Sequence, residues 1–286
     1  MKINNLTLKE IPLRLRRLSD APATLYASSN GVQLKKLLTR PCVAIIGSRK
    51  VSPYGRQVTA DLTSQLAGQG IVVVSGLALG VDGIAHQATV EAGGQAIAVL
   101  PGPLQQIYPA THRWLAQAII DHEGLLISEY PAESPTHPGN FIARNRLIAG
   151  LADAVLITEA AEKSGSLHTA DFALQQAKTV MAVPGNITSP TSVGTNALIR
   201  AGATPVTSAS DVLEALGIPA APHQAITSSN PAEQAILTAL AHGITEAEAL
   251  QRASQLAISE FNQSLTMLEI TGKIRSLGAN HWALRV

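Results

Sequence analysis

The stretch VAIIGSRK, residues 43–50, decides the fold of this chain. It is a short run of apolar, mostly β-branched residues that ends in a glycine and a polar turn. An apolar run without polar alternation is typical of a strand that is covered on both faces, as in a parallel sheet. The pattern recurs along the chain, at residues Ile71–Ser75, Ala96–Leu100, Leu125–Glu129, Ala154–Thr158 and Thr179–Val183.

Segments with helical spacing separate these predicted strands, and two of them are Tyr54–Ala67 and Ser166–Ala177. Strands that alternate with helices of this length indicate an α/β fold with a doubly wound parallel sheet. A last helix–strand–helix piece is expected to close the sheet, over residues 196–201, 204–207 and 210–216.

A second, smaller region follows a segment of linker composition, GIPAAPHQAITSSNPA at 217–232. Beyond it the sequence predicts three helices, over 231–242, 246–253 and 259–272, and a two-stranded wing, over 273–277 and 281–286. This is the pattern of a winged helix-turn-helix. A helical appendage that only packs is the alternative. We expect four parts, namely a basic N-terminal extension over 1–41 that leads into the core, a core over 42–217, a linker over 218–230 and a winged-helix-like domain over 231–286.

The composition excludes several classes of protein. With 46% hydrophobic residues among 286, the chain can form a packed core, which argues against a disordered or fibrous protein. The sequence contains no apolar run long enough for a membrane span and no secretory signal, and its single cysteine, Cys42, cannot form an internal disulfide. We therefore expect a cytoplasmic protein that does not associate with membranes.

Charge is distributed unevenly along the chain. The formal net charge is only +1, yet residues 1–41 carry eight Lys or Arg residues against Glu10 and Asp20. A surface that binds phosphates must therefore be local and built from few residues.

The ends of the first two predicted core strands carry the first candidate binding residues. Gly47, Ser48 and Arg49 follow one strand, and Ser75 and Gly76 end the next. Ligands of doubly wound sheets bind at such strand ends, where glycines allow close approach and Arg suits a phosphate. The alternative is that the glycines only make tight turns. The spacing matches neither a dinucleotide fingerprint nor a P-loop, so no nucleotide cofactor is expected.

Two further segments carry polar side chains that suit a nucleic acid. Phe141 precedes Arg144, Asn145 and Arg146, and an arginine beside a ring can neutralise a phosphate while a base stacks. The alternative places Phe141 in the core and pairs the arginines with acids such as Glu129 or Asp153. The second segment is Ser164, Gly165 and Ser166, which open a helix and expose backbone N–H groups to an anion, or else simply cap that helix. The histidines lack the spacing of metal ligands, and no catalytic constellation stands out, so neither a metal site nor an enzyme is expected.

These segments together resemble the DNA-processing protein A family, DprA/Smf. The resemblance spans about residues 10–216 and rests on the G-S-R turn at 47–49, SGLALGVDGIAH (75–86), YP (108–109), SEYP (128–131), NFIARNRLIAGL (140–151), EAAEKSGSLHTA (159–170), VPG (183–185) and GTNALIRAGA (194–203). The segment from residue 231 is similar to the winged-helix module of that family.

The resemblance implies a function and a role for each candidate residue. It implies an extended Rossmann-like core that binds single-stranded DNA, forms a homodimer, protects incoming DNA in natural transformation and loads the RecA recombinase, without catalysis. Arg49 would lie in a phosphate pocket with Gly47 and Ser48 donating to the same anion, and Phe141 would stack on a base. Arg144 and Arg146 would shape or charge the pocket, and the glycine-rich turns at 75–76 and 164–166 would form its other walls.

The sequence departs from the family at three places. Many relatives begin with a helical N-terminal domain, which we expect to be missing here because the core is predicted to start after about 40 residues. Pro138-Gly139-Asn140 stands where relatives often have a lysine, and His168 stands where an aliphatic residue is usual. The basic residues of 1–41 are a candidate compensation for weaker DNA binding.

Two other functions stay open at this point. A nucleotide-hydrolysing enzyme of the phosphoribohydrolase type has similar strand ends, although its P-G-G-x-G-T-x-x-E signature is absent from Pro184-Gly185-Asn186. A protein-interaction role suits the C-terminal domain, because its predicted third helix carries Glu260 and Glu269 but no Lys or Arg.

Overall fold

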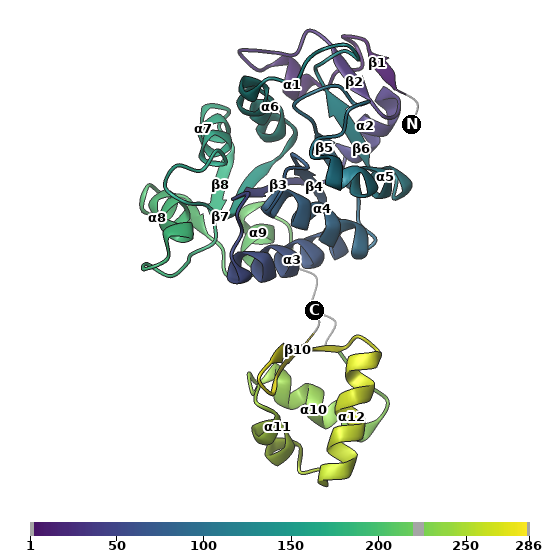
Figure 1. Cartoon of the computed structure of the whole chain (residues 1–286), viewed down its shortest axis with the longest axis vertical. Coiled ribbons are helices and arrows are strands. Elements are labelled where there is room, and N and C mark those ends of the chain that lie inside the picture. Colours follow the sequence, from purple (N-terminus) through teal and green to yellow (C-terminus); the bar gives the residue numbers. More distant parts are fainter. Residues whose placement is uncertain (1–2, 220–225, 285–286) are drawn as a thin grey trace. The chain divides into compact units, whose positions relative to one another are not determined.

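The computed structural model describes residues 3–219 and 226–284, and it divides the chain into two units, residues 1–220 and 221–286 (Figure 1). We describe each unit by itself. Part of the predicted linker, residues 220–225, lies outside the described residues, as do residues 285–286 of the predicted wing. None of the described helices combines the length and the apolar character needed to cross a bilayer.

A nine-stranded sheet forms the centre of the first unit, in the order β1-β2-β6-β5-β4-β3-β7-β8-β9. The seven strands from β6 to β9 in this order run parallel, which confirms the predicted α/β sheet. The strands are β1 (Asn4–Leu6), β2 (Leu25–Ala27), β3 (Cys42–Gly47), β4 (Val72–Ser75), β5 (Ala96–Val99), β6 (Leu125–Ser128), β7 (Ala154–Glu159), β8 (Thr179–Ala182) and β9 (Thr204–Pro205).

The N-terminal region differs from the expected extension. Strands β1 and β2 pair antiparallel with each other, and β2 pairs antiparallel with β6, so they form one edge of the same sheet. Residue 42 therefore does not mark the start of the core. Each of these strands has only three residues, which is too short to show a periodicity in the sequence.

Helices cover both faces of the sheet (Figure 1). Successive residues of β3 point to opposite faces of the sheet, so Ala44 packs in one hydrophobic cluster and Ile45 in another. Both faces are therefore apolar and need a covering layer. One face is covered by α1 (Leu13–Arg16), α2 (Gly31–Leu37), α6 (Pro138–Leu151), α7 (Leu167–Gln175) and α8 (Val193–Arg200). The other is covered by α3 (Pro53–Gly68), α4 (Val81–Glu91), α5 (Arg113–Asp121) and α9 (Ala209–Ala215). The 3₁₀ turns η1 (Ala110–His112) and η2 (Pro190–Ser192) precede α5 and α8.

The order in which the chain adds strands to the sheet reverses between β3 and β7, although the two strands themselves run parallel. From β3 it proceeds through β4 and β5 to β6, and β7 then returns to the other side of β3 and continues to β8 and β9. The crossover connections on the two sides leave a crevice at the carboxyl ends of the two strands, where ligands of such folds bind.

Over residues 226–284, the part that the structure describes, the second unit consists of three helices and a two-stranded antiparallel sheet, as predicted. Its elements are α10 (Pro231–Ala241), α11 (Ala247–Ser254), α12 (Ile258–Ile270), β10 (Ile274–Gly278) and β11 (His281–Leu284). Leu250, Phe261 and Leu268 from the helices are buried together with Ile274 from the first strand. A single bridge between Glu246 and His281 connects the start of α11 to the wing.

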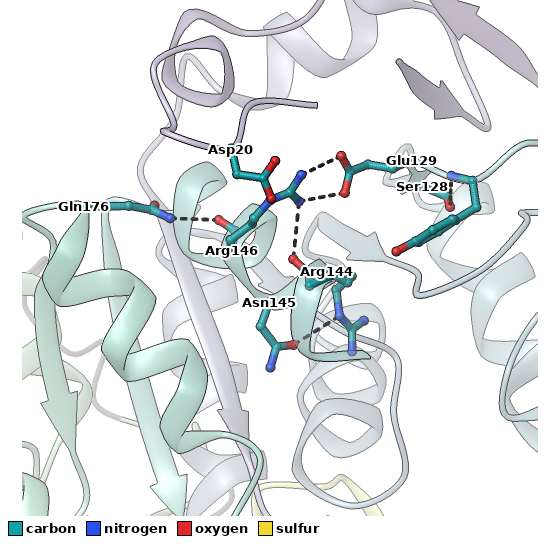
Figure 2. A network of polar contacts seen from close by, with 9 residues as sticks. Asp20, Ser128, Glu129, Arg144, Asn145, Arg146 and Gln176 are labelled. Carbon is teal, nitrogen blue, oxygen red and sulfur yellow. Dashed lines mark hydrogen bonds and ion pairs between the residues drawn. The ribbon is translucent and has the colours of Figure 1, made fainter. Parts of the chain in front are cut away.

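An ion-pair network connects α6 to Glu129, the residue that follows β6 (Figure 2). Arg146 donates from Nη1 to one carboxylate oxygen of Glu129, at 2.6 Å, and from Nη2 to the other, at 2.7 Å. Its Nε donates to Asp20 at 3.1 Å, which brings the N-terminal region into the network. Burial on its own would lower the pKa of Arg146, but the hydrogen bonds and charges of Glu129 and, to a smaller extent, Asp20 outweigh it and raise that pKa. Arg146 therefore stays ionised.

The two acids of this network should contribute unequally to stability. Replacing Glu129 by Gln removes the bidentate partner of a side chain that is only 9% exposed, and should lower the free energy of unfolding by about 2 kcal/mol, between the values for exposed and fully buried pairs. The control is Asp20→Asn, which should cost no more than about 0.5 kcal/mol because Asp20 is 81% exposed. Urea denaturation of the whole chain measures both, and equal losses would contradict this account.

Candidate nucleic-acid interface

A cavity of about 780 Å³ lies at the carboxyl ends of β3 and β7, where the chain reverses direction. The loop after β3, the loop before α7 and the first half of α6 form its walls. Nine of the twelve residues that the sequence predicted for binding line it, namely Gly47, Ser48, Arg49, Phe141, Arg144, Asn145, Ser164, Gly165 and Ser166. Segments that are far apart in the sequence therefore meet at one site.

The loop after β3 exposes two cations to this cavity. Arg49 and Lys50 are both exposed, while the preceding backbone is tightly packed. A Cβ at Gly47 would lie 2.6 Å from the carbonyl oxygen of Glu159 and 2.7 Å from the side chain of Val81, so only glycine fits there. The tight packing holds the loop in place and leaves its charged side chains free to reach a ligand.

Ser48 has a structural role that differs from the expected one. Its hydroxyl donates to the carbonyl oxygen of Lys50 at 2.8 Å and accepts from the Lys50 N–H at 3.1 Å. Its backbone N–H donates to the carbonyl oxygen of Glu159 at 2.8 Å. Both donors are used within the fold, so Ser48 shapes the turn, and the prediction that it donates to a bound anion does not fit this structure.

Two aromatic rings lie beside Arg49 at the rim. The guanidinium carbon of Arg49 lies 4.9 Å from the centroid of the Phe141 ring, in a cation–π arrangement. Tyr108 meets Phe141 edge to face, with the ring centroids 5.4 Å apart, and is 55% exposed. A base can therefore stack on Tyr108, or on the face of Phe141 that Arg49 leaves open.

A buried arginine forms the floor of the cavity. Arg144 is 3% exposed, and its Nη1 donates to the carbonyl oxygen of Gly76, at 2.7 Å, and to that of Val99. A Cβ at Gly76 would overlap the guanidinium, so glycine is required beside it. Burial lowers the pKa of Arg144 to about 10, and the charge of Asp82 opposes this effect. The side chain therefore remains positively charged at neutral pH.

Asp82 brings a single carboxylate to the lining of the cavity. It is 7% exposed, and its Oδ2 accepts from the Gly76 N–H at 3.0 Å. Burial raises its pKa, while Arg144 and the backbone N–H groups of Ala78 and Gly76 act in the opposite direction. Asp82 and Arg144 thus both contact Gly76, and together they hold the loop after β4 in place.

The loop before α7 forms the open side of the cavity. The hydroxyls of Ser164 and Ser166 hydrogen-bond to each other at 2.8 Å, and the Asn145 side-chain amide donates to the carbonyl oxygen of Gly165 at 3.4 Å. A Cβ at Gly165 would meet no atom within 4 Å, so this glycine faces open space. Lys163 beside it is exposed and adds another cation to the lining.

Three predicted site residues do not line the cavity. Ser75 is fully buried, and its hydroxyl donates to the carbonyl oxygen of Ile45 at 2.7 Å. Gly76 lies behind Arg144, against its guanidinium. Arg146 points away from Arg144 and pairs with Glu129 (Figure 2), which is the alternative that the sequence left open for the arginines. Arg144 and Arg146 are two residues apart in α6, and residues i and i+2 of a helix point about 200° apart around its axis. The two arginines therefore cannot share a face.

The prediction from sequence also missed four charged or aromatic residues of the lining. Lys50 and Lys163 each adjoin a predicted binding residue, and their charge was the signal for including them. Tyr108 lies in the YP motif, where only the ring itself suggested a role. Asp82 lies in the first turn of α4 and carries no binding pattern of its own. Within residues 3–219 and 226–284, no cluster of His, Cys, Asp or Glu side chains could hold a metal ion.

Comparison with known protein families assigns both units. Residues 3–217 match the family model of the DNA recombination-mediator protein A, and residues 219–280 match the model of the DprA winged helix domain. The second match confirms the prediction of a winged-helix region at the end of the chain.

Individual relatives and solved structures agree with this assignment. The DNA processing protein DprA of Bacillus subtilis is 40% identical over 73% of this chain and 69% of its own length. Protein Smf of Escherichia coli is 34% identical over 96% of this chain and 75% of its own length.

Two solved structures share the fold. The X-ray structure of DprA from Streptococcus pneumoniae has a TM-score of 0.68 at 36% identity and covers 74% of each chain. The DNA processing protein A of Helicobacter pylori, described for its single-stranded DNA binding mode, has a TM-score of 0.67 at 35% identity and covers 75% of this chain and 95% of its own. The fold, the motifs and the family model together show that this chain belongs to the DprA/Smf family of DNA recombination-mediator proteins.

Proposed function

We propose that this protein binds single-stranded DNA in the cavity between β3 and β7, as part of DNA processing in recombination. The observation that carries the proposal is the juxtaposition of the Arg49 guanidinium with the rings of Phe141 and Tyr108, above the buried charge of Arg144. Cations beside stacking platforms are the combination that single-strand binding requires. The relative from H. pylori, whose structure is described for binding single-stranded DNA, supports the same ligand.

The architecture of the cavity favours an unpaired strand over a duplex. Arg49, Lys50 and Lys163 are exposed at the rim and can pair with phosphates, whereas the rings lie where a base must enter. A duplex keeps its bases stacked inside and offers only their edges in the grooves. A single strand can place its phosphates on the cations and a base against Phe141 or Tyr108 at the same time.

We further propose that this protein forms a homodimer, loads the RecA recombinase and protects incoming DNA in natural transformation, in the cytoplasm. These parts of the proposal rest on the resemblance to the DprA/Smf family. A pull-down of purified RecA with the DNA-bound protein tests the RecA contact, and sedimentation of the protein alone tests the homodimer. Failure to retain RecA would overturn the loading role, and sedimentation as a monomer would overturn the homodimer.

Loss of the Arg49 charge should weaken binding and reduce its salt dependence. Arg49→Ala should lower the affinity for single-stranded DNA about ten- to a hundredfold, since a hydrogen bond to a charged group contributes about 1.5–3 kcal/mol. The slope of log K against log salt should fall by about 0.7 for each phosphate that the protein no longer neutralises. Fluorescence anisotropy with a labelled oligonucleotide over a salt series measures both. Arg56→Ala is the matched control, because Arg56 is exposed on α3 and does not line the cavity.

Loss of the aromatic ring should weaken binding without changing the salt slope. Phe141→Leu removes a stacking platform but no charge, and base stacking contributes about 1–3 kcal/mol per base, or roughly five- to a hundredfold in affinity. The same anisotropy series distinguishes this variant from Arg49→Ala. Trp114→Leu serves as control, since Trp114 is 56% exposed on α5 and outside the cavity lining. A Phe141→Leu variant that binds as the wild type does would remove this ring from the interface.

We propose that the cavity binds its ligand without catalysis. Asp82 is the carboxylate in its lining, and it is buried and hydrogen-bonded to the Gly76 N–H, which suits a positioning role. Prolonged incubation with nucleoside monophosphates should therefore release no free base, as followed by chromatography. Release that disappears in Asp82→Asn would instead establish nucleotide hydrolysis, the alternative function.

A further inference from the structure

A second cavity, of about 350 Å³, lies in the N-terminal region and is bordered by basic side chains. Lys9, Arg14, Arg16 and Lys35 surround it. Its remaining wall is formed by apolar side chains and a proline, at Ile11, Pro12, Leu13 and Leu38. We call this cavity with its four cations the basic groove. It shares no residue with the cavity between β3 and β7.

Helix α6 borders the first cavity and also contacts a residue of the basic groove. Pro138 and Phe141, at the start of this helix, line the first cavity. At its other end the Arg14 guanidinium donates to the carbonyl oxygen of Leu151, at 2.6 Å, and pairs with Asp153 at 3.3 Å. A helix of this length, 14 residues, spans about 21 Å. Ile148, in the last turn of the helix, also lines the first cavity, so α6 leads from one cavity to the other.

The charges of the basic groove are largely uncompensated. Lys9, Arg16 and Lys35 are exposed, and among the described residues none of the three forms an ion pair. Glu10 is the nearby acid, and its carboxylate accepts from the N–H and hydroxyl of Thr7, while Lys35 helps to lower its pKa. In a chain with a net charge of only +1, such an accumulation is the footprint of an anionic ligand.

We propose that the basic groove binds the phosphate backbone of the single strand whose bases occupy the cavity between β3 and β7. Three long, exposed cations around an open groove suit an extended polyanion, because a single phosphate would engage only one or two of them. The apolar wall has no aromatic ring and no base-reading amide, so the interaction is independent of sequence. This inference rests on the proposed function for the identity of the strand.

The test compares two triple variants that remove the same charge from the whole chain. Lys9→Ala/Arg16→Ala/Lys35→Ala removes the exposed cations of the basic groove, whereas Arg56→Ala/Arg113→Ala/Arg200→Ala removes three exposed arginines from α3, α5 and α8. Each is titrated by anisotropy with oligothymidylates of about six and about forty nucleotides, because single-strand sites of one module span about 4–16 nucleotides. Lys9→Arg/Arg16→Lys/Lys35→Arg keeps the charge and should restore binding.

The expected result depends on strand length. The groove variant should bind the short strand as the wild type does, but should bind the long strand at least tenfold more weakly. Its salt slope for the long strand should be smaller by about 2, because three phosphates are no longer neutralised. The control variant should keep the slope for both strands. Equal losses in the two triple variants, or an unchanged slope for the long strand, would overturn the inference.

The two proposals fail in different ways. If Arg49→Ala leaves short-strand binding intact but the groove variant loses the long strand, the first cavity is not the DNA site and the groove is a nucleic-acid surface by itself. If Arg49→Ala abolishes short-strand binding and the groove variant binds both the short and the long strand as the wild type does, the proposed function holds and the inference is wrong. Circular dichroism confirms that each variant is folded before titration.

Discussion

The burial of helix α6 against the sheet is the constraint on which the rest of the structure depends. Its last five residues, Leu147–Leu151, are buried, and all of them except Gly150 belong to a hydrophobic cluster of the core, which fixes the rotation of the helix about its axis. With the rotation fixed, Phe141, Arg144 and Asn145 share the face that is turned to the cavity, since positions i, i+3 and i+4 lie together on a helix. Arg146 is then directed to the other side, where Glu129 compensates its charge.

The same helix connects three features that the chain encodes far apart. Its first turn contributes Phe141 to the aromatic rim, its middle contributes the buried Arg144 to the floor, and the carbonyl oxygen of its last residue, Leu151, accepts from Arg14 of the N-terminal region. Because a packed helix is rigid over its length, the cavity between β3 and β7 and the basic groove keep a constant separation. Such a pair of sites can hold a strand at two points without a moving part.

Electrostatics in this protein depend on placement more than on composition. The net charge of +1 conceals exposed cations at the rim of one cavity and around another, while the buried ion pairs serve the fold. Arg144 and Arg146 illustrate the difference, although only one residue separates them. The first donates to backbone carbonyl groups beside the ligand site and forms no direct ion pair among the described residues, whereas the second pairs directly with Glu129 and Asp20.

The strands and helices of the core were predictable because their signal is local. The apolar runs at β3, β4 and β7 contain the strand pattern within a few residues, and the glycine-rich turns that follow them indicate the edge where a ligand binds. The three-residue strands β1 and β2 have no such pattern, and only their pairing with β6 makes them part of the sheet. Their membership is therefore a property of the folded state.

The sequence by itself determined the α/β core, the winged-helix region and most residues of the candidate site, because each of these follows from periodicity, turn chemistry or motif spacing within one segment. Only the tertiary structure decided which groups are free to act. The hydroxyl and the N–H of Ser48 donate within the fold, to Lys50 and Glu159. Arg146 pairs with Glu129, and Tyr108 and Lys163 reach the rim from distant segments of the chain. The physical reason is that availability depends on the partners that packing places around a group, and those partners are remote in sequence.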